Sequence, residues 1–124
     1  FWECCDMLSA HGITPLSLYT EGDGWSAMLL ATAEMADTQA GADFLEEVYP
    51  KSYNNDSVYH MAETLLKMFR YTQKDAVYSD YDEAYNNFIM GNAAMFPNDC
   101  FMIEEMEAKK IKGKQRKIQK KPLP

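Results

Sequence analysis

The residues of this sequence that could bind a ligand are aromatic rings that stand beside carboxylate and amide side chains. They fall in two short segments and are Asp23, Gly24, Trp25, Asn98, Asp99 and Phe101. An aromatic face packs against the apolar C–H face of a sugar ring, and carboxylate and amide groups hydrogen-bond to the sugar hydroxyls. The combination is therefore typical of a carbohydrate site. The two rings would also suit a hydrophobic core, and their positions alone leave both interpretations open.

Motifs for nucleotides and metal ions are incomplete. Gly22 and Gly24 lack the third glycine of a dinucleotide-binding turn, and no Gly-Lys-Ser/Thr sequence follows them. Asp80 and Asp82 have the spacing that opens a calcium loop, but the later ligands and the central glycine are missing. The two histidines stand apart from each other and from any cysteine motif, so no zinc site is predicted. We expect neither a cofactor nor a metal ion.

Catalytic residues cannot be assigned from the sequence. Neither histidine has a serine or cysteine partner at a recognisable motif spacing, so no nucleophile and base can be named. Glu104, Glu105 and Glu107 crowd one predicted helix, and paired carboxylates can hydrolyse glycosidic bonds, but a solvated acidic face is the simpler interpretation. The three cysteines do not suggest a disulfide scaffold, and we expect them to be buried thiols. We expect a protein that is not an enzyme.

Charge divides the chain into two parts. Its 124 residues and 14.2 kDa suffice for one domain. All 19 acidic residues lie in residues 1–108 with only four of the 12 basic residues, whereas residues 109–124 hold the other eight basic residues. The acidic part repels nucleic acid, so we expect no nucleic-acid partner. We expect residues 1–108 to form a partial folded domain and residues 109–124 to be a basic, disordered tail.

Hydrophobic spacing predicts a mostly helical chain that positions the candidate site residues. Apolar residues recur at helical intervals in segments 1–11, 25–36, 43–48, 56–71, 80–89 and 99–106. Two short strands are predicted, over residues 13–19 and 93–96. Asp80, followed three residues later by Glu83, forms an acidic capping box at the start of one helix. Each predicted strand runs into one of the two segments that carry the candidate site residues.

Three stretches of the sequence carry a family resemblance. Residues 8–16 read LSAHGITPL, residues 22–25 read GDGW, and residues 81–97 read YDEAYNNFIMGNAAMFP. Their order and spacing resemble the middle of the extracellular solute-binding proteins of family 1, the carbohydrate-capturing subunits of bacterial ABC importers. The resemblance implies an α/β fold, in which this chain is a helix-rich internal fragment, with few short strands, of a two-lobed periplasmic-binding-protein-like (type II) fold. It would come mainly from the second lobe.

The resemblance also implies where a ligand binds. In that family, the loop that carries Gly24 and Trp25 and the turn after the second strand reach towards the cleft between the lobes. That turn usually reads Gly-Ser-Trp, whereas this chain has Asp99, Cys100 and Phe101 there. Phenylalanine keeps a face for stacking but loses the indole N–H.

The function expected from the sequence is the binding of a sugar or oligosaccharide and its delivery to the membrane permease subunits of an ABC importer, by hinged closure on the ligand. The intact protein is expected to be a monomer, located extracellularly as a cell-surface lipoprotein or in the periplasm. Two alternatives stay open. One is a small acidic helical interaction module that meets a basic partner, and the other is a glycan-active enzyme that uses the acidic helix.

Overall fold

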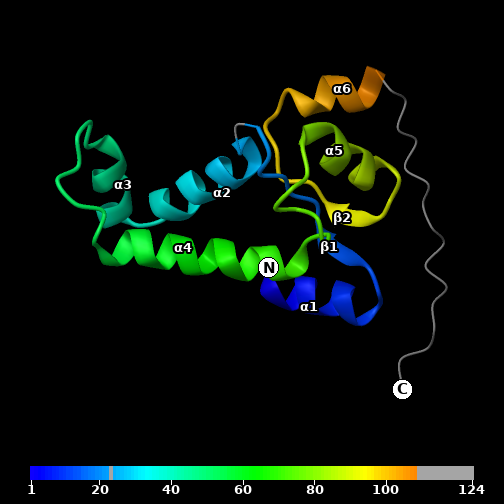
Figure 1. Cartoon of the computed structure of the whole chain (residues 1–124), viewed down its shortest axis with the longest axis horizontal. Helices are drawn as coiled ribbons and strands as arrows, with labels where there is room; N and C mark the ends of the chain where they lie inside the picture. The colour runs from blue at the N-terminus through cyan, green and yellow to red at the C-terminus, as the bar shows by residue number, and fades with distance from the viewer. Residues whose placement is uncertain (23, 109–124) are drawn as a thin grey trace.

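Helices make up most of the protein, and two short strands lie among them. The computed structural model describes residues 1–22 and 24–108. In chain order the elements are α1 (Trp2–Ala10), β1 (Thr14–Leu16), α2 (Trp25–Ala36), α3 (Gln39–Glu46), α4 (Asp56–Met68), the 3-10 turn η1 (Phe69–Tyr71), α5 (Tyr81–Ile89), β2 (Ala93–Met95) and α6 (Met102–Ala108) (Figure 1). The prediction of a helix-rich chain with few short strands is confirmed, while the two-lobed arrangement stays a prediction. The predicted basic tail lies outside the described residues.

Three predicted elements have different limits in the structure. The last helix, predicted over residues 99–106, begins only at Met102 as α6, because Asn98 and Asp99 form a turn before it. The strand predicted over residues 13–19 is confined to Thr14–Leu16, because β2 is only three residues long and pairs with no more of it. The short helix predicted from residue 43 already begins at Gln39 as α3. Its start is set by Thr38, whose side-chain hydroxyl accepts a hydrogen bond from the backbone N–H of Gly41 (3.1 Å).

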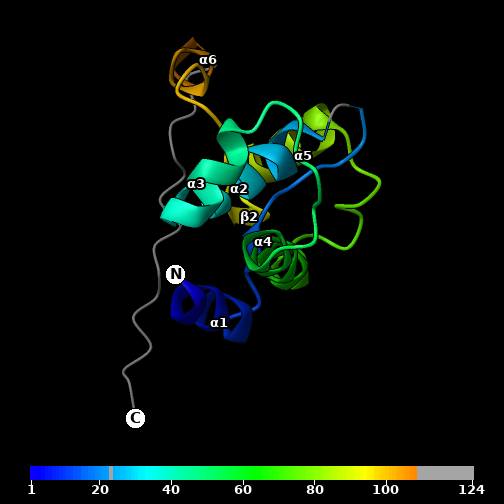
Figure 2. The same ribbon diagram turned by 90° about the vertical axis from the view of Figure 1, so that its left-hand side faces the viewer.

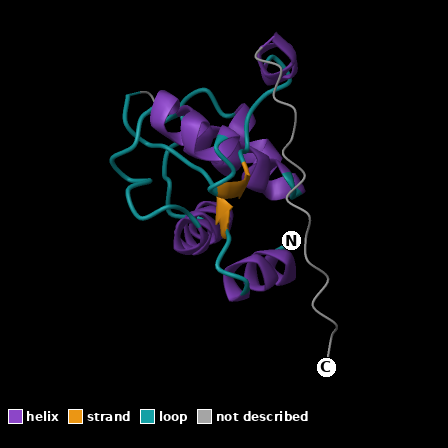
Figure 3. Ribbon diagram, turned by 90° about the vertical axis from the view of Figure 1, so that its right-hand side faces the viewer, coloured by secondary structure: helices purple, strands orange, loops and turns teal. Residues whose placement is uncertain are grey.

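The two strands pair in parallel and form the centre of the fold. Leu16 lies opposite Met95, and the N–H of Ser17 donates to the carbonyl of Met95 (2.9 Å). On its other side, Leu16 makes a single bridge to Thr72. Figure 3 shows the short strands surrounded by helices. Because parallel strands end at the same edge of a sheet, the two segments that follow them leave the sheet in the same direction.

Beyond β1 the chain stays buried, and side chains take the place of a neighbouring strand. The side-chain amide of Gln73 accepts a hydrogen bond from the N–H of Leu18 (3.2 Å) and donates one to its carbonyl (2.5 Å). The hydroxyl of Ser26 likewise accepts from the N–H of Tyr19 (3.2 Å) and donates to its carbonyl (3.0 Å). Buried backbone groups need such partners, so these two side chains fix the path of the segment after β1.

A small hydrophobic core surrounds this segment. Its members are the buried Leu16, Leu18 and Ala76 and the partly buried Leu30, Met68, Phe69, Tyr71 and Met95. In Figure 2, α4 lies between α2 and α1. The helix α5 is attached through Ser17, whose hydroxyl donates to the carbonyl of Ala84 (2.8 Å). Within the described residues, no helix is both long enough and apolar enough to cross a bilayer.

Replacing Gln73 by leucine should destabilise the fold, because the N–H and carbonyl of Leu18 would then be buried without partners. We expect the free energy of unfolding to fall by about 2 to 4 kcal/mol, from the desolvation cost of the two backbone groups. Chemical denaturation followed by circular dichroism measures this loss. The matched control is Gln39→Leu on the exposed surface of α3, where little should change. Equal losses in both variants would contradict the role given to Gln73.

Candidate ligand-binding site

A hollow of about 480 Å³ opens where several elements begin or end. It is lined by Tyr19, Glu21, Gly22, Trp25, Asp80, Tyr81 and Phe101, and we call it the aromatic hollow. These residues come from the segment after β1, the start of α2, the start of α5 and the turn before α6. Figure 1 shows α6 and the start of α2 on the same side of the molecule as α5. The volume lies within the range of small-molecule sites.

The structure brings the two predicted aromatic site residues together. Trp25 is the first residue of α2 and follows Gly24, whose left-handed backbone (φ 63°) suits glycine. Phe101 comes just before α6, and about half of its side chain is exposed (52%). Although they lie far apart in the sequence, both rings line the aromatic hollow. A purely structural role in the core is therefore the weaker interpretation for Phe101.

The other predicted site residues that the structure describes are not among the residues that line the aromatic hollow. Asp23 is outside the described residues, and Gly24 shapes the turn that starts α2. Asn98 and Asp99 do not line the hollow. In each, a side-chain oxygen accepts a hydrogen bond from the backbone N–H of the next residue: the amide oxygen of Asn98 from Asp99 (2.8 Å), and a carboxylate oxygen of Asp99 from Cys100 (2.5 Å). The bond from Cys100 holds the pKa of Asp99 below its usual range. These two residues therefore shape the turn that presents Phe101.

Five residues of the aromatic hollow were not predicted as site residues. They are Tyr19, Glu21, Gly22, Asp80 and Tyr81. The sequence pattern assigns Asp80 to helix capping, and this assignment is confirmed, because its carboxylate accepts from the N–H of Glu83 (2.9 Å) and the capping box is complete. The sequence did contain a signal for two of these residues, since Tyr19 lies at the end of a predicted strand and Tyr81 at the start of a predicted helix. Ends of strands and starts of helices are common places for binding residues.

Tyr81 connects the elements that surround the aromatic hollow. Its ring stacks on Tyr85 (centroids 5.8 Å apart, interplanar angle 6°) and meets the edge of Tyr19 (5.8 Å, 89°). Its hydroxyl donates to the Glu105 carboxylate (3.0 Å) and lies at the same distance from the sulfur of Met102. Helix α6 is thereby attached to α5. Burial raises the pKa of Tyr81 well above its usual value, and the bond to Glu105 raises it further.

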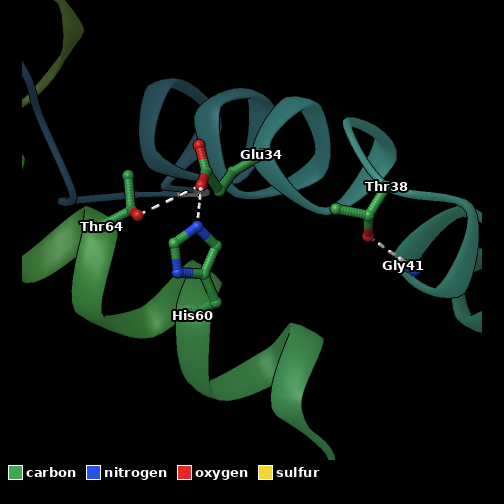
Figure 4. A network of polar contacts seen from close by, with 5 residues as sticks. All are labelled: Glu34, Thr38, Gly41, His60 and Thr64. Atoms are coloured by element: carbon green, nitrogen blue, oxygen red, sulfur yellow. Dashed lines mark hydrogen bonds and ion pairs between the residues drawn. The ribbon is translucent and has the colours of Figure 1, made fainter.

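A second polar group of residues connects α2 with α4 (Figure 4). The Nε2 atom of His60 lies 3.0 Å from a carboxylate oxygen of Glu34, and the hydroxyl of Thr64 donates to the same oxygen (3.2 Å). These three side chains border a different hollow, of about 410 Å³, that also includes Trp2. None of them lines the aromatic hollow. Their contacts hold α2 and α4 together.

The cysteines only partly match their predicted burial. Cys5 is buried, and burial raises the pKa of its thiol, whereas Cys4 and Cys100 are exposed. The expectation of buried thiols is thus wrong for the latter two. In α1, adjacent cysteines point in different directions and only Cys5 is turned inward, while Cys100 lies in the exposed turn before α6. Within residues 1–22 and 24–108, no three His, Cys, Asp or Glu side chains come together in a group that could hold a metal ion.

Comparisons of the chain with protein-family models, curated proteins and solved structures gave no significant match. The geometry of the aromatic hollow, together with the resemblance of residues 8–16, 22–25 and 81–97, is what bears on function. Four aromatic rings and two carboxylates facing one hollow can stack on a flat apolar surface and accept hydrogen bonds at its edge.

The bond between Tyr81 and Glu105 predicts how the protein responds to alkaline pH. Replacing Glu105 by glutamine removes the negative charge and should lower the pKa of Tyr81, although burial keeps it raised. A spectrophotometric titration of phenolate formation measures the shift, and Tyr81→Phe identifies the contribution of this tyrosine. Glu104→Gln, at an exposed position of α6, is the control and should leave the titration unchanged.

The same shift has a consequence for stability. A raised pKa in the folded state stabilises the protein below the pKa of an unfolded tyrosine, about 10, and this contribution is lost as pH rises from there towards the pKa of folded Tyr81. Thermal melts across this window should therefore fall less steeply for Glu105→Gln than for the unaltered protein. An unchanged slope together with an unchanged titration would show that Glu105 has no influence on Tyr81.

Proposed function

We propose that this chain belongs to a sugar-binding protein that feeds an ABC importer and that the aromatic hollow forms part of its ligand site. The observation that carries the proposal is that Trp25 and Phe101, from two distant segments, line one hollow together with Tyr19 and Tyr81. Both segments are predicted to bind ligand from residue chemistry and from the resemblance.

The lining suits a ring-shaped ligand with hydroxyl groups at its edge. Aromatic faces gain about 1 kcal/mol from stacking beyond the burial of apolar area. The carboxylates of Glu21 and Asp80 can accept hydrogen bonds from sugar hydroxyls, which are good donors. Glu21 is exposed at the rim of the hollow, and Asp80 is fixed by its capping hydrogen bonds. A saccharide could therefore stack on the rings and be oriented by the acids.

The transport role follows from the resemblance. A hinged protein of this family closes two lobes on its ligand and presents the closed form to membrane permease subunits. Here the half-exposed ring of Phe101 leaves the aromatic hollow open on one side, as expected for one wall of such a cleft. The proposal places the intact protein outside the cytoplasm, as a monomeric lipoprotein or periplasmic protein, with this chain an internal fragment drawn mainly from its second lobe.

The two alternative functions receive less support from the geometry. A glycan-active enzyme would use the acidic residues of α6 for catalysis. Glu104 and Glu107 are exposed and do not line the aromatic hollow, and Glu105 holds the hydroxyl of Tyr81. An acidic interaction module would need a docking surface but no aromatic hollow. Binding without catalysis is therefore the function we propose.

Substituting alanine for Trp25 tests the proposal. If the indole stacks on a sugar, binding should weaken by about 1 to 3 kcal/mol, the range for losing one aromatic face, with little change in melting temperature. Isothermal titration calorimetry against a panel of oligosaccharides derived from starch, cellulose, xylan, chitin and chitosan measures the binding. Thermal melts of the same samples measure the stability.

The other tryptophan provides the matched control. Trp2 lies at the start of α1, with the ammonium of Lys67 4.0 Å from its ring centre, and it lines a different hollow. Trp2→Ala should leave sugar affinity unchanged. If Trp25→Ala instead costs about 3 to 5 kcal/mol of stability and leaves affinity unaltered, the indole is a core residue and the site assignment fails. Failure of every oligosaccharide to bind would refute the proposed function.

A further inference from the structure

The charged side chains that line the aromatic hollow are all acidic among the described residues. Two carboxylates, those of Glu21 and Asp80, line it, and a third, that of Glu105, is bound to the hydroxyl of the lining residue Tyr81. No lysine, arginine or histidine lines it among the described residues. The basic residues of the described chain lie elsewhere, at Lys51, Lys67, Arg70 and Lys74. The charged side chains that a ligand meets among the described lining residues are therefore all negative.

A neutral sugar does not require such a lining. Its hydroxyls are satisfied equally well by the uncharged amides of asparagine and glutamine, which both donate and accept. Amide side chains line a different hollow, of about 540 Å³, which includes Gln73, Asn86, Asn87 and Asn92. The aromatic hollow contains no amide side chain among its described lining residues. Its side-chain acceptors include two carboxylates, which carry charge.

Aromatic rings and carboxylates together favour a cation. The faces of tryptophan and tyrosine rings carry negative quadrupole charge and attract ammonium groups, and a carboxylate adds a direct Coulomb attraction. One oxygen of Asp80 accepts the capping hydrogen bond from Glu83, so the other can face a ligand. Burial and the bond to Glu105 keep Tyr81 protonated, and its ring therefore stays a neutral stacking surface.

We infer that the ligand of the aromatic hollow is a cationic saccharide, an amino sugar whose free ammonium group is held by Glu21 and Asp80 against the aromatic faces. This inference rests on the proposed sugar-binding function and names the class of sugar. The sugar ring stacks on Trp25 or Phe101, and the ammonium takes the place that a hydroxyl would take in a neutral ligand. No bond is made or broken in this binding.

Two matched oligosaccharides test the inference. A β-1,4-linked tetramer of glucosamine and the same tetramer with every amine acetylated have equal length and linkage and differ in charge. Calorimetric titration at mildly acidic pH keeps the amines protonated while ordinary carboxylates stay ionised. The cationic tetramer should bind at least about tenfold more tightly than the acetylated one, and this difference should shrink as salt is added.

Variants that lack the two carboxylates show whether Glu21 and Asp80 cause the preference for the cationic tetramer. The double substitution Glu21→Gln and Asp80→Asn should abolish the preference for the cationic tetramer, while asparagine still caps α5. The control is Glu104→Gln with Glu107→Gln, which removes the same charge from exposed positions of α6 outside the hollow. This control should keep the preference. A preference lost equally in both double variants would mean that only net charge matters and would overturn the assignment to Glu21 and Asp80.

The remaining outcomes separate the inference from the function on which it rests. Tetramethylammonium serves as a cation without a sugar. Equal or tighter binding of the acetylated tetramer would overturn the cationic preference and leave the sugar-binding function standing. Binding of tetramethylammonium as tight as that of the glucosamine tetramer, with no neutral sugar bound, would overturn the sugar-binding function and leave the preference for a cation. Absence of binding by all three would overturn both.

Discussion

The structure depends on providing hydrogen-bond partners for the backbone of one extended segment, residues 14–21, of which residues 15–19 are buried. A sheet normally does this with strands on both sides, but here the described chain supplies only the short β2 and a single bridge at Thr72. Gln73 and Ser26 complete the pairing from a loop and a helix. The N–H groups of Thr20 and Glu21 then both donate to the carbonyl of Ser79. An unpaired buried amide costs as much as a lost core contact, so this pairing determines which elements must lie next to the segment.

The same pairing assembles the aromatic hollow. Because Ser26 is bound to Tyr19, the start of α2 lies beside the end of the extended segment, and Trp25 lies there with it. Because the carbonyl of Ser79 is bound by the end of that segment, the start of α5 and its Tyr81 lie on the opposite side. Helix α6 is attached through the hydrogen bond from the hydroxyl of Tyr81 to the carboxylate of Glu105. Hydrogen bonds made for folding therefore bring together rings from four parts of the chain.

Helix positions were predictable from the sequence because they depend on local patterns. The capping box at Asp80 and the apolar spacing after it define α5, and the structure agrees. The true length of β1 was not predictable, since it depends on how much of a distant strand reaches it. Of the residues that line the aromatic hollow, residue chemistry predicted Trp25 and Phe101 as site residues. It missed Tyr19, because alternation along a predicted strand does not show which of its side chains will face a hollow formed by other elements.

Asp80 can cap α5 and contact a ligand at the same time, because capping uses only one of its carboxylate oxygens. A carboxylate at a helix N-terminus is stabilised by the helix dipole, and one of its oxygens is used by the capping bond from Glu83. The capping box also holds the side chain in one position, so a ligand group that approaches the other oxygen meets a charge that is already oriented. Preorganised charge contributes more to binding than mobile charge, because little conformational entropy is lost when the ligand arrives. Exposed Glu21 lacks such support, so in the binding mode that we propose Asp80 is the stronger determinant of which ligand the aromatic hollow accepts.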